Sequence, residues 1–159
     1  MQPIGIRNNN PLNIRVGKDK WKGQVLPQRA IAESEQLVTE GKVGKSGEGA
    51  VFCQFQSMEY GIRAAFCLLR TYARKYRLYS VRDIITRWAP PSENDTASYI
   101  RHVCMMTGFG GNQRLTEKDW PRLVKAMARM ECGVELEDDV IQKARRSLTP
   151  NPSPKREGN

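Results

Sequence analysis

The segment Trp88–Thr96 brings an aromatic ring, two prolines and two carboxyl groups together in a short stretch of chain. A double proline cannot continue a helix, because each ring removes an N–H donor and clashes with the preceding turn. We therefore expect a rigid corner that begins at Trp88. If the corner instead points its polar groups into a cleft, a carboxyl group there can act as a general acid. Glu93 is the candidate catalytic acid, since a restricted apolar setting raises a carboxyl pKa, and Asp95 is its candidate partner.

The polar residues of this corner also have a structural interpretation. Glu93, Asn94 and Asp95 can satisfy the unpaired N–H groups at the start of the next helix. Carboxylates so close in sequence rarely straddle a sugar ring. Pairing of Arg7 or Arg15 with Glu93 or Asp95 would instead give a polar network that fixes the fold. Capping, glycan contact and catalysis all stay open at this point.

Amide and aromatic side chains elsewhere in the chain provide further candidate contacts with a glycan. Amides can hydrogen-bond N-acetyl groups, and aromatic rings can stack on the face of a sugar. Clustered asparagines also make turns, and a tryptophan beside a glycine also fills a core, so both interpretations remain. The candidate glycan-binding residues are Asn10, Asn13, Trp21, Trp88, Asn94 and Tyr99.

The cysteine and histidine pattern argues against a metal centre. Cys53, Cys67, Cys104 and Cys132 are widely spaced, and His102 is the single histidine. Free thiols in a reducing compartment are the expected state of the four cysteines. We expect neither a metal site nor a cofactor.

Hydrophobic periodicity predicts a mainly helical fold. Apolar residues recur at helical spacing from residue 58 to 76, and a helix start at Ser80 leads into the corner. A helix after the corner should stop at Gly108, another should run from Thr116 to about Gly133, and a short one covers 136–146. Alternating residues predict short strands at 12–15 and 50–55, which gives a small β-hairpin in the N-terminal third.

The expected organisation is one domain over residues 1–147, interrupted by a flexible loop at 27–50. The proline-rich tail 148–159 should be disordered, because it has almost nothing to bury. No apolar run approaches the ~20 residues of a membrane helix. The N-terminus has no apolar segment typical of a signal peptide, so we expect synthesis in the cytoplasm.

Positive charge is concentrated in the first part of the chain. The formal net charge is +9, and residues 1–90 carry 15 Lys and Arg against 7 Asp and Glu. A basic surface favours polyanions, either nucleic acid or the anionic polymers of a bacterial envelope. A solvated helix face that happens to be basic is the alternative. The residues of this predicted basic face are Arg63, Arg70, Arg74, Lys75 and Arg77.

Three blocks of sequence resemble a family of small phage and prophage virion structural proteins. The blocks are Gly5–Arg15 with Trp21-Lys22-Gly23, Phe55–Ala65, and Trp88–Thr96, and they occur in order across residues 5–107. The resemblance implies a virion component with other virion proteins as partners.

A weaker similarity links the chain to bacterial glucosaminidases and lysozyme-like muramidases. Trp21-Lys22-Gly23, Phe52–Ser57 and Tyr99–Val103 follow the order of segments in those enzymes. The similarity implies a lysozyme-like helical domain that grips peptidoglycan. Cleavage of its glycosidic bond would need an acid of raised pKa, usually with a second carboxylate across the sugar. Those enzymes carry their catalytic glutamate upstream of the Asn-Pro block, and that position has no counterpart before Gly5.

These observations favour a phage-derived protein that binds or cleaves peptidoglycan glycan strands, as a glycoside hydrolase, a lytic transglycosylase or an inactive relative. The alternative is a non-enzymatic virion protein or a DNA-associated basic protein. In either case we expect it to reach the virion or the cell wall after assembly or lysis.

Overall fold

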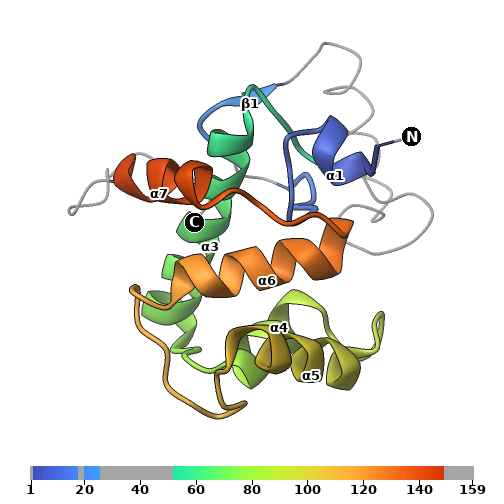
Figure 1. Ribbon diagram of the computed structural model, residues 1–159, viewed down its shortest axis with the longest axis vertical. Helices are drawn as coiled ribbons and strands as arrows, with labels where there is room; N and C mark the ends of the chain where they lie inside the picture. The colour runs from blue at the N-terminus through green and yellow to red at the C-terminus, as the bar shows by residue number, and fades with distance from the viewer. Residues whose placement is uncertain (1, 18–19, 26–51, 149–159) are drawn as a thin grey trace.

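Helices dominate the structure, and a two-stranded sheet lies at one end (Figure 1). The structure is a computed structural model that describes residues 2–17, 20–25 and 52–148. Its helices are α1 (Ile4–Arg7), α3 (Met58–Tyr76), α4 (Val81–Trp88), α5 (Thr96–Thr107), α6 (Trp120–Cys132) and α7 (Asp138–Arg146), and its strands are β1 (Gln24–Val25) and β2 (Gln54–Phe55). The mainly helical class with a small N-terminal hairpin is therefore confirmed. The predicted loop at 27–50 and residues 149–159 of the predicted tail lie outside the described residues.

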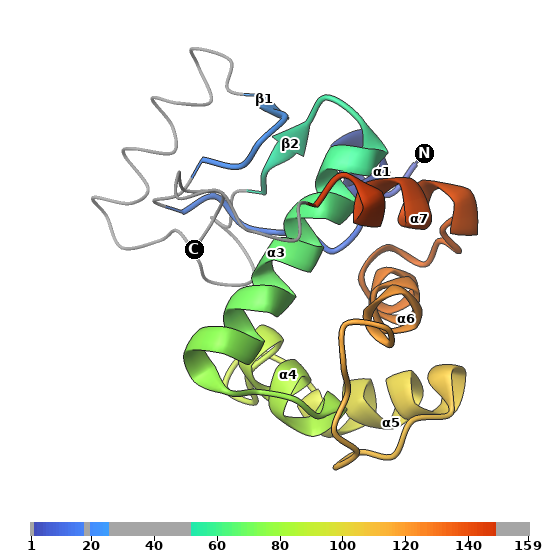
Figure 2. The same cartoon turned by 90° about the vertical axis from the view of Figure 1, so that its left-hand side faces the viewer.

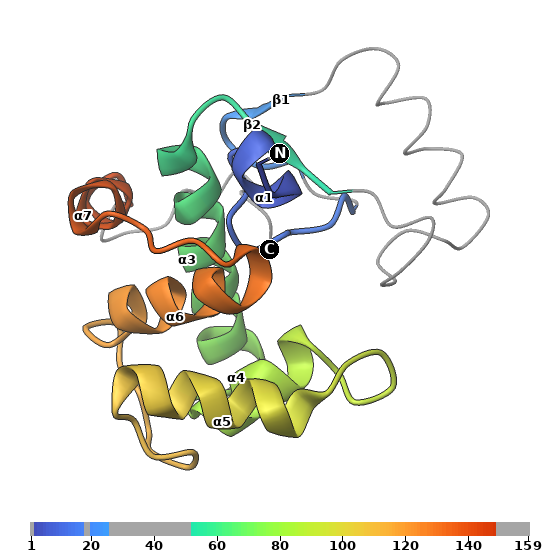
Figure 3. The same ribbon diagram turned by 45° about the vertical axis from the view of Figure 1, so that its right-hand side comes forward.

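Helix α3 runs from the sheet to α4 and organises the domain (Figure 2). The Ser57 hydroxyl caps its start by accepting the Tyr60 N–H, and Arg77 ends it in the left-handed conformation. Helices α6 and α7 both pack on α3, and α5 packs on α6 (Figure 3). Because α3 has neighbours on several sides, it buries more than one stripe of side chains.

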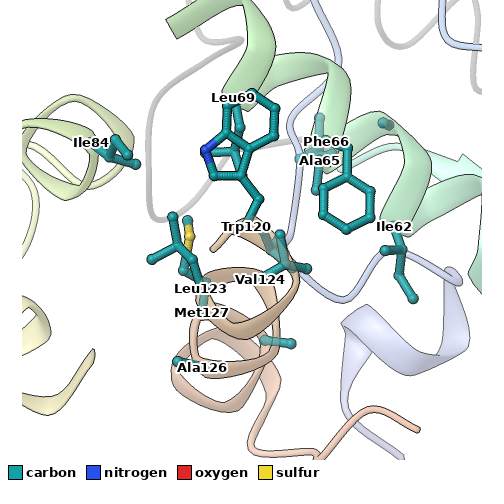
Figure 4. Close-up of a cluster of buried hydrophobic side chains, with 14 of the residues drawn as sticks. Ile62, Ala65, Phe66, Leu69, Ile84, Trp120, Leu123, Val124, Ala126 and Met127 are labelled. Carbon is teal, nitrogen blue, oxygen red and sulfur yellow. The ribbon is translucent and has the colours of Figure 1, made fainter. Parts of the chain in front are cut away.

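One large part of the core lies between α3 and α6 (Figure 4). Side chains of both helices are almost completely buried there, at the three- and four-residue spacing that the sequence predicts. These core residues include Ile62, Ala65, Phe66 and Leu69 from α3, and Trp120, Leu123, Val124 and Met127 from α6.

The sheet is shorter than the sequence pattern predicts. Strands β1 and β2 pair antiparallel, with Gln24 opposite Phe55. The predicted strand at 12–15 is wrong: only Arg15 makes an isolated bridge, to Phe52. Asn13 has a φ of 52°, which interrupts an extended chain. Of the predicted strand at 50–55, the described part contains the Phe52 bridge and β2.

The N-terminal segment docks against the start of α3 through a glycine. A Cβ atom on Gly61 would lie 1.9 Å from the carbonyl oxygen of Asn9. Asn9 has a φ of 53°, and its side-chain amide donates to the Phe55 carbonyl at 3.0 Å. The close approach therefore depends on the missing side chain of Gly61, and it holds residues 9–15 beside the helix.

The predicted corner joins α4 to α5. Helix α4 starts with a Ser80 cap and ends at Trp88, and the Thr96 hydroxyl donates to the Ala89 carbonyl across the corner. The Asp95 carboxylate caps α5 by accepting the Ser98 N–H at 3.2 Å. The predicted helix ends at Gly108 and Gly133 are both confirmed as left-handed caps.

Only some side chains of the predicted basic face are exposed to solvent. Arg63 is 5% exposed, with its guanidinium 3.9 Å from the Cys67 sulfur, so this member of the face is corrected. Arg70 is largely buried and pairs with Glu117 at 3.8 Å. The remaining basic side chains, Arg74, Lys75 and Arg77, are exposed near the end of α3. Within the described residues, no helix is long and apolar enough to cross a membrane.

Candidate functional site

A cleft of about 460 Å³ opens between the N-terminal segment, α3, the α4–α5 corner and the end of α6. Its walls combine aromatic rings with charged and amide groups, which is the character of a ligand site. The described residues that line it are Leu12, Asn13, Ile14, Arg15, Gly17, Trp21, Phe52, Leu68, Tyr72, Arg87, Trp88, Ala89, Pro90, Glu93, Asn94 and Glu131.

Glu131, near the end of α6, is the most constrained polar group of the cleft. The Tyr99 hydroxyl donates to its Oε2 at 2.8 Å, and the Asn13 amide lies 3.5 Å from its Oε1 and 3.2 Å from its backbone oxygen. The Trp88 side chain also hydrogen-bonds to it, and Arg15 adds a favourable charge. Burial nevertheless dominates and raises the pKa of the Glu131 carboxyl above its usual value. The site therefore favours the protonated form more than water does.

Glu93 supplies a second carboxylate from the corner. Its Oε2 lies 3.5 Å from Arg15 Nη1, and both side chains are 24% exposed. Arg15 is thus paired with one carboxylate of the cleft and attracts the other. The predicted contact between the N-terminal arginine and the corner is present as this Arg15–Glu93 pair.

Aromatic side chains form the wall on the α3–α4 side. The rings of Tyr72 and Trp88 meet edge to face, with centroids 6.1 Å apart. The Arg87 guanidinium lies over Tyr72 and Tyr76, at 5.5 and 3.7 Å from the ring centroids. Burial raises the pKa of Tyr72 to about 12, so its hydroxyl stays protonated near neutral pH. This wall therefore combines two aromatic rings with one guanidinium.

Comparison with known proteins shows which family the chain belongs to. No family model matches it. Over 132 residues it is 40% identical to Protein P5 of Pseudoalteromonas phage PM2, an alignment that covers 81% of this chain and 71% of that protein. The chain belongs to the Protein P5 family. The predicted phage relationship is therefore confirmed.

The cleft of this Protein P5 relative brings together five of the predicted site residues. They come from the N-terminal segment and from the corner, and they are Asn13, Trp21, Trp88, Glu93 and Asn94. Trp21 is only 7% exposed, so little of its ring is open to the cleft.

Three predicted site residues do not line the cleft. Asn10 is fully buried: its amide donates to the Ile14 and Cys53 carbonyls and accepts the Ile14 N–H, each at 2.9 Å. Asp95 caps α5 at the surface. Tyr99 is 7% exposed and reaches the cleft through its hydrogen bond to Glu131.

Glu131 is the site residue that the sequence interpretation missed. It follows the apolar stripe of α6 and lies next to the end of that helix. A negative charge is unfavourable at a helix C-terminus, where the dipole is negative. An acidic residue at that position of an amphipathic helix is therefore a signal that could have drawn attention to it.

Thiols and acidic groups give no metal site in the described part of the chain, since they form no group of three that could hold an ion. None of the four cysteines, all of them in the described residues, forms a disulfide. Burial raises the pKa of Cys53 to about 12, so this thiol is neutral and unreactive.

Proposed function

We propose that this Protein P5 relative is a virion component that binds the glycan strands of bacterial peptidoglycan in the cleft. The virion role is supported by membership of a phage protein family and by the three sequence blocks. Peptidoglycan is a barrier that a phage crosses on entry and on release, so a wall-binding protein has a use at either step.

The chemistry of the cleft supports a sugar ligand. A sugar ring has an apolar face of C–H groups and a rim of hydroxyl and amide groups. Trp88 offers an aromatic surface, while Asn94, Arg15 and Glu93 offer hydrogen-bonding groups around it. The juxtaposition of Trp88 with these polar groups in one open cleft is the observation that carries the proposal.

The overall charge supports the same partner. A net charge of +9 attracts an envelope whose polymers are anionic, and this raises the rate of encounter. The exposed Arg74, Lys75 and Arg77 belong to this attraction, not to the cleft itself. Binding of nucleic acid by these three side chains is a weaker proposal, because Arg63 is buried and Arg70 is ion-paired.

Titration with a soluble, uncharged chito-oligosaccharide tests the proposal, since it separates glycan recognition from attraction between charges. We expect the wild type to bind with an affinity that hardly changes between low and high salt. Trp88→Ala should weaken binding at least tenfold, and Trp88→Phe should weaken it less because an aromatic ring remains. Circular dichroism establishes that each variant is folded.

A second variant guards against misfolding of the first. Asn94 lies in the cleft, and its amide makes a surface hydrogen bond to the Pro90 carbonyl. Asn94→Ala should therefore stay folded and lose part of the affinity. Absence of chito-oligosaccharide binding by the wild type, together with no retention on purified sacculi, would refute the proposal and favour a purely structural virion role.

A further inference from the structure

We propose that the cleft also cleaves the glycosidic bond of the bound strand, with Glu131 as the acid. This inference rests on the glycan-binding function proposed above and adds a reaction to it. It assigns the acid to α6, whereas the sequence interpretation placed it at Glu93 in the corner.

The two acidic residues among the described lining of the cleft are Glu131 and Glu93, and their surroundings differ. Glu131 is half-buried in the wall of the cleft, and burial raises the pKa of its carboxyl. Glu93 is more open and carries an ion pair with Arg15 at 3.5 Å. A half-buried carboxylic acid and an ion-paired carboxylate therefore line the same cleft, as general-acid catalysis of glycoside cleavage requires.

The hydrogen-bond donors around Glu131 suit the state that follows proton transfer. Tyr99 donates to Oε2 at 2.8 Å, Asn13 lies 3.5 Å from Oε1, and Trp88 also hydrogen-bonds to the carboxyl group. These contacts stabilise the carboxylate left behind when the proton goes to the sugar. Before the transfer, burial favours the protonated form of Glu131. The carboxyl group can therefore both carry the proton and release it.

The reaction balances with water as the second substrate. Glu131 gives its proton to the glycosidic oxygen, and the bond between C1 and that oxygen breaks, leaving positive charge on the C1 sugar. The negative charge of Glu93 stabilises this cation. Water then adds to C1 and returns a proton to Glu131, which restores the acid and releases a new reducing end.

A structural role is the competing explanation for Glu131, because its contacts tie α6 to α5 and to the N-terminal segment. The dependence of rate on pH distinguishes the two. The ionisable groups that face Glu131 are Arg15 and Tyr99, and the Cys132 thiol is its neighbour in the chain. Of these, Tyr99 can be changed most conservatively, and its hydrogen bond lowers the pKa of Glu131.

The central experiment measures release of reducing ends from purified peptidoglycan, with chito-oligosaccharide binding measured in parallel. We expect Glu131→Gln to reduce the rate by about 10²-fold or more while affinity changes less than threefold. Glu117→Gln is the matched control, because Glu117 is an exposed glutamate that pairs with Arg70. This variant should keep the wild-type rate. In water enriched in ¹⁸O, the new reducing end should carry the label at C1.

Each result discriminates. A wild type that binds glycan but releases no reducing ends overturns this inference and leaves the proposed function standing. A wild type that neither binds glycan nor releases reducing ends overturns both the inference and the proposed function. Full activity in Glu131→Gln, or an unlabelled anhydro product, also overturns the assignment. If Glu131→Gln does not fold, Tyr99→Phe decides: it should raise the pKa of Glu131 and move the alkaline limb of the rate profile to higher pH, and an unmoved limb contradicts the acid role.

Discussion

The side chain of Asn10 is predicted to stabilise the domain more than any other polar group near the cleft. It is fully buried, and its amide makes three hydrogen bonds to the backbone, two to Ile14 and one to Cys53. In Asn10→Ala the Ile14 carbonyl keeps a partner, because it also accepts the Cys53 N–H at 2.8 Å. The Ile14 N–H and the Cys53 carbonyl lose theirs.

Each buried backbone group left without a partner costs about 1–3 kcal/mol. The expected loss in the free energy of unfolding for Asn10→Ala is therefore about 2–6 kcal/mol, a large part of the ~5–15 kcal/mol that holds a domain together. Urea denaturation followed by circular dichroism measures it. The matched control is Asn94→Ala, at an exposed amide with a 3.3 Å bond to Pro90, where we expect a change within about 0.5 kcal/mol.

Asn10→Asp adds a dependence on pH to the same test. The new carboxyl has the shape of the amide but faces two carbonyl oxygens, so burial should raise its pKa in the folded state. A protein loses folding stability when a group has a higher pKa in the folded state than in the unfolded state and the pH rises from the unfolded-state pKa to the folded-state pKa. The variant should therefore be less stable at pH 7 than at pH 4, relative to wild type. A loss for Asn10→Ala below about 0.5 kcal/mol, or an Asn10→Asp variant that gains relative stability towards pH 7, would refute the structural assignment.

Three further expectations follow from the fold. Gly61→Ala should lower the free energy of unfolding by about 1–3 kcal/mol in urea titrations, because its Cβ would meet a backbone oxygen at 1.9 Å. The control Gly17→Ala, where a Cβ meets nothing within 4 Å, should be nearly neutral. A stabilised Gly61→Ala variant would contradict the close approach. A double-mutant cycle between Arg15 and Glu93 should give a coupling below about 1 kcal/mol that weakens with salt, since both side chains are 24% exposed; a larger, salt-independent value would show a desolvated pair. Cys53, with a pKa near 12, should react with a disulfide reagent only as fast as the protein opens; prompt labelling of the native state would argue against its burial.

Local signals predicted α3, α4, α5 and α7, since the information that starts and stops a helix lies within a few residues. The start of α6 was predicted at Thr116 but lies at Trp120, and the short α1 was not predicted. The Ser80 start and the Gly108 stop depend on side-chain caps and on a left-handed glycine. The 12–15 segment was predicted wrongly because only local signals were available there too. Its alternating residues are typical of a strand, but the positive φ of Asn13 is set by contacts with distant parts of the chain, including Glu131.

Long-range contacts explain why Glu131 could not be found from spacing. Glu131 meets Tyr99 from α5 and Asn13 from the N-terminal segment, residues 32 and 118 positions away. No periodicity within α6 records those partners. Arg63 shows the converse: a helical pattern placed it opposite an apolar stripe, but additional neighbours of α3 bury it.

The corner at Trp88–Thr96 combines the structural and the functional interpretations of its sequence. Asp95 caps α5, and the Thr96 hydroxyl donates to the Ala89 carbonyl, so the backbone on both sides of the prolines is fixed. Glu93 and Asn94 lie between these anchors and line the cleft, and Trp88 precedes them. A residue held on both sides by a cap and a proline loses little entropy when it binds a ligand. Capping is therefore the means by which the corner presents its polar groups, and loosening the cap should weaken the proposed glycan binding although it changes no side chain that lines the cleft.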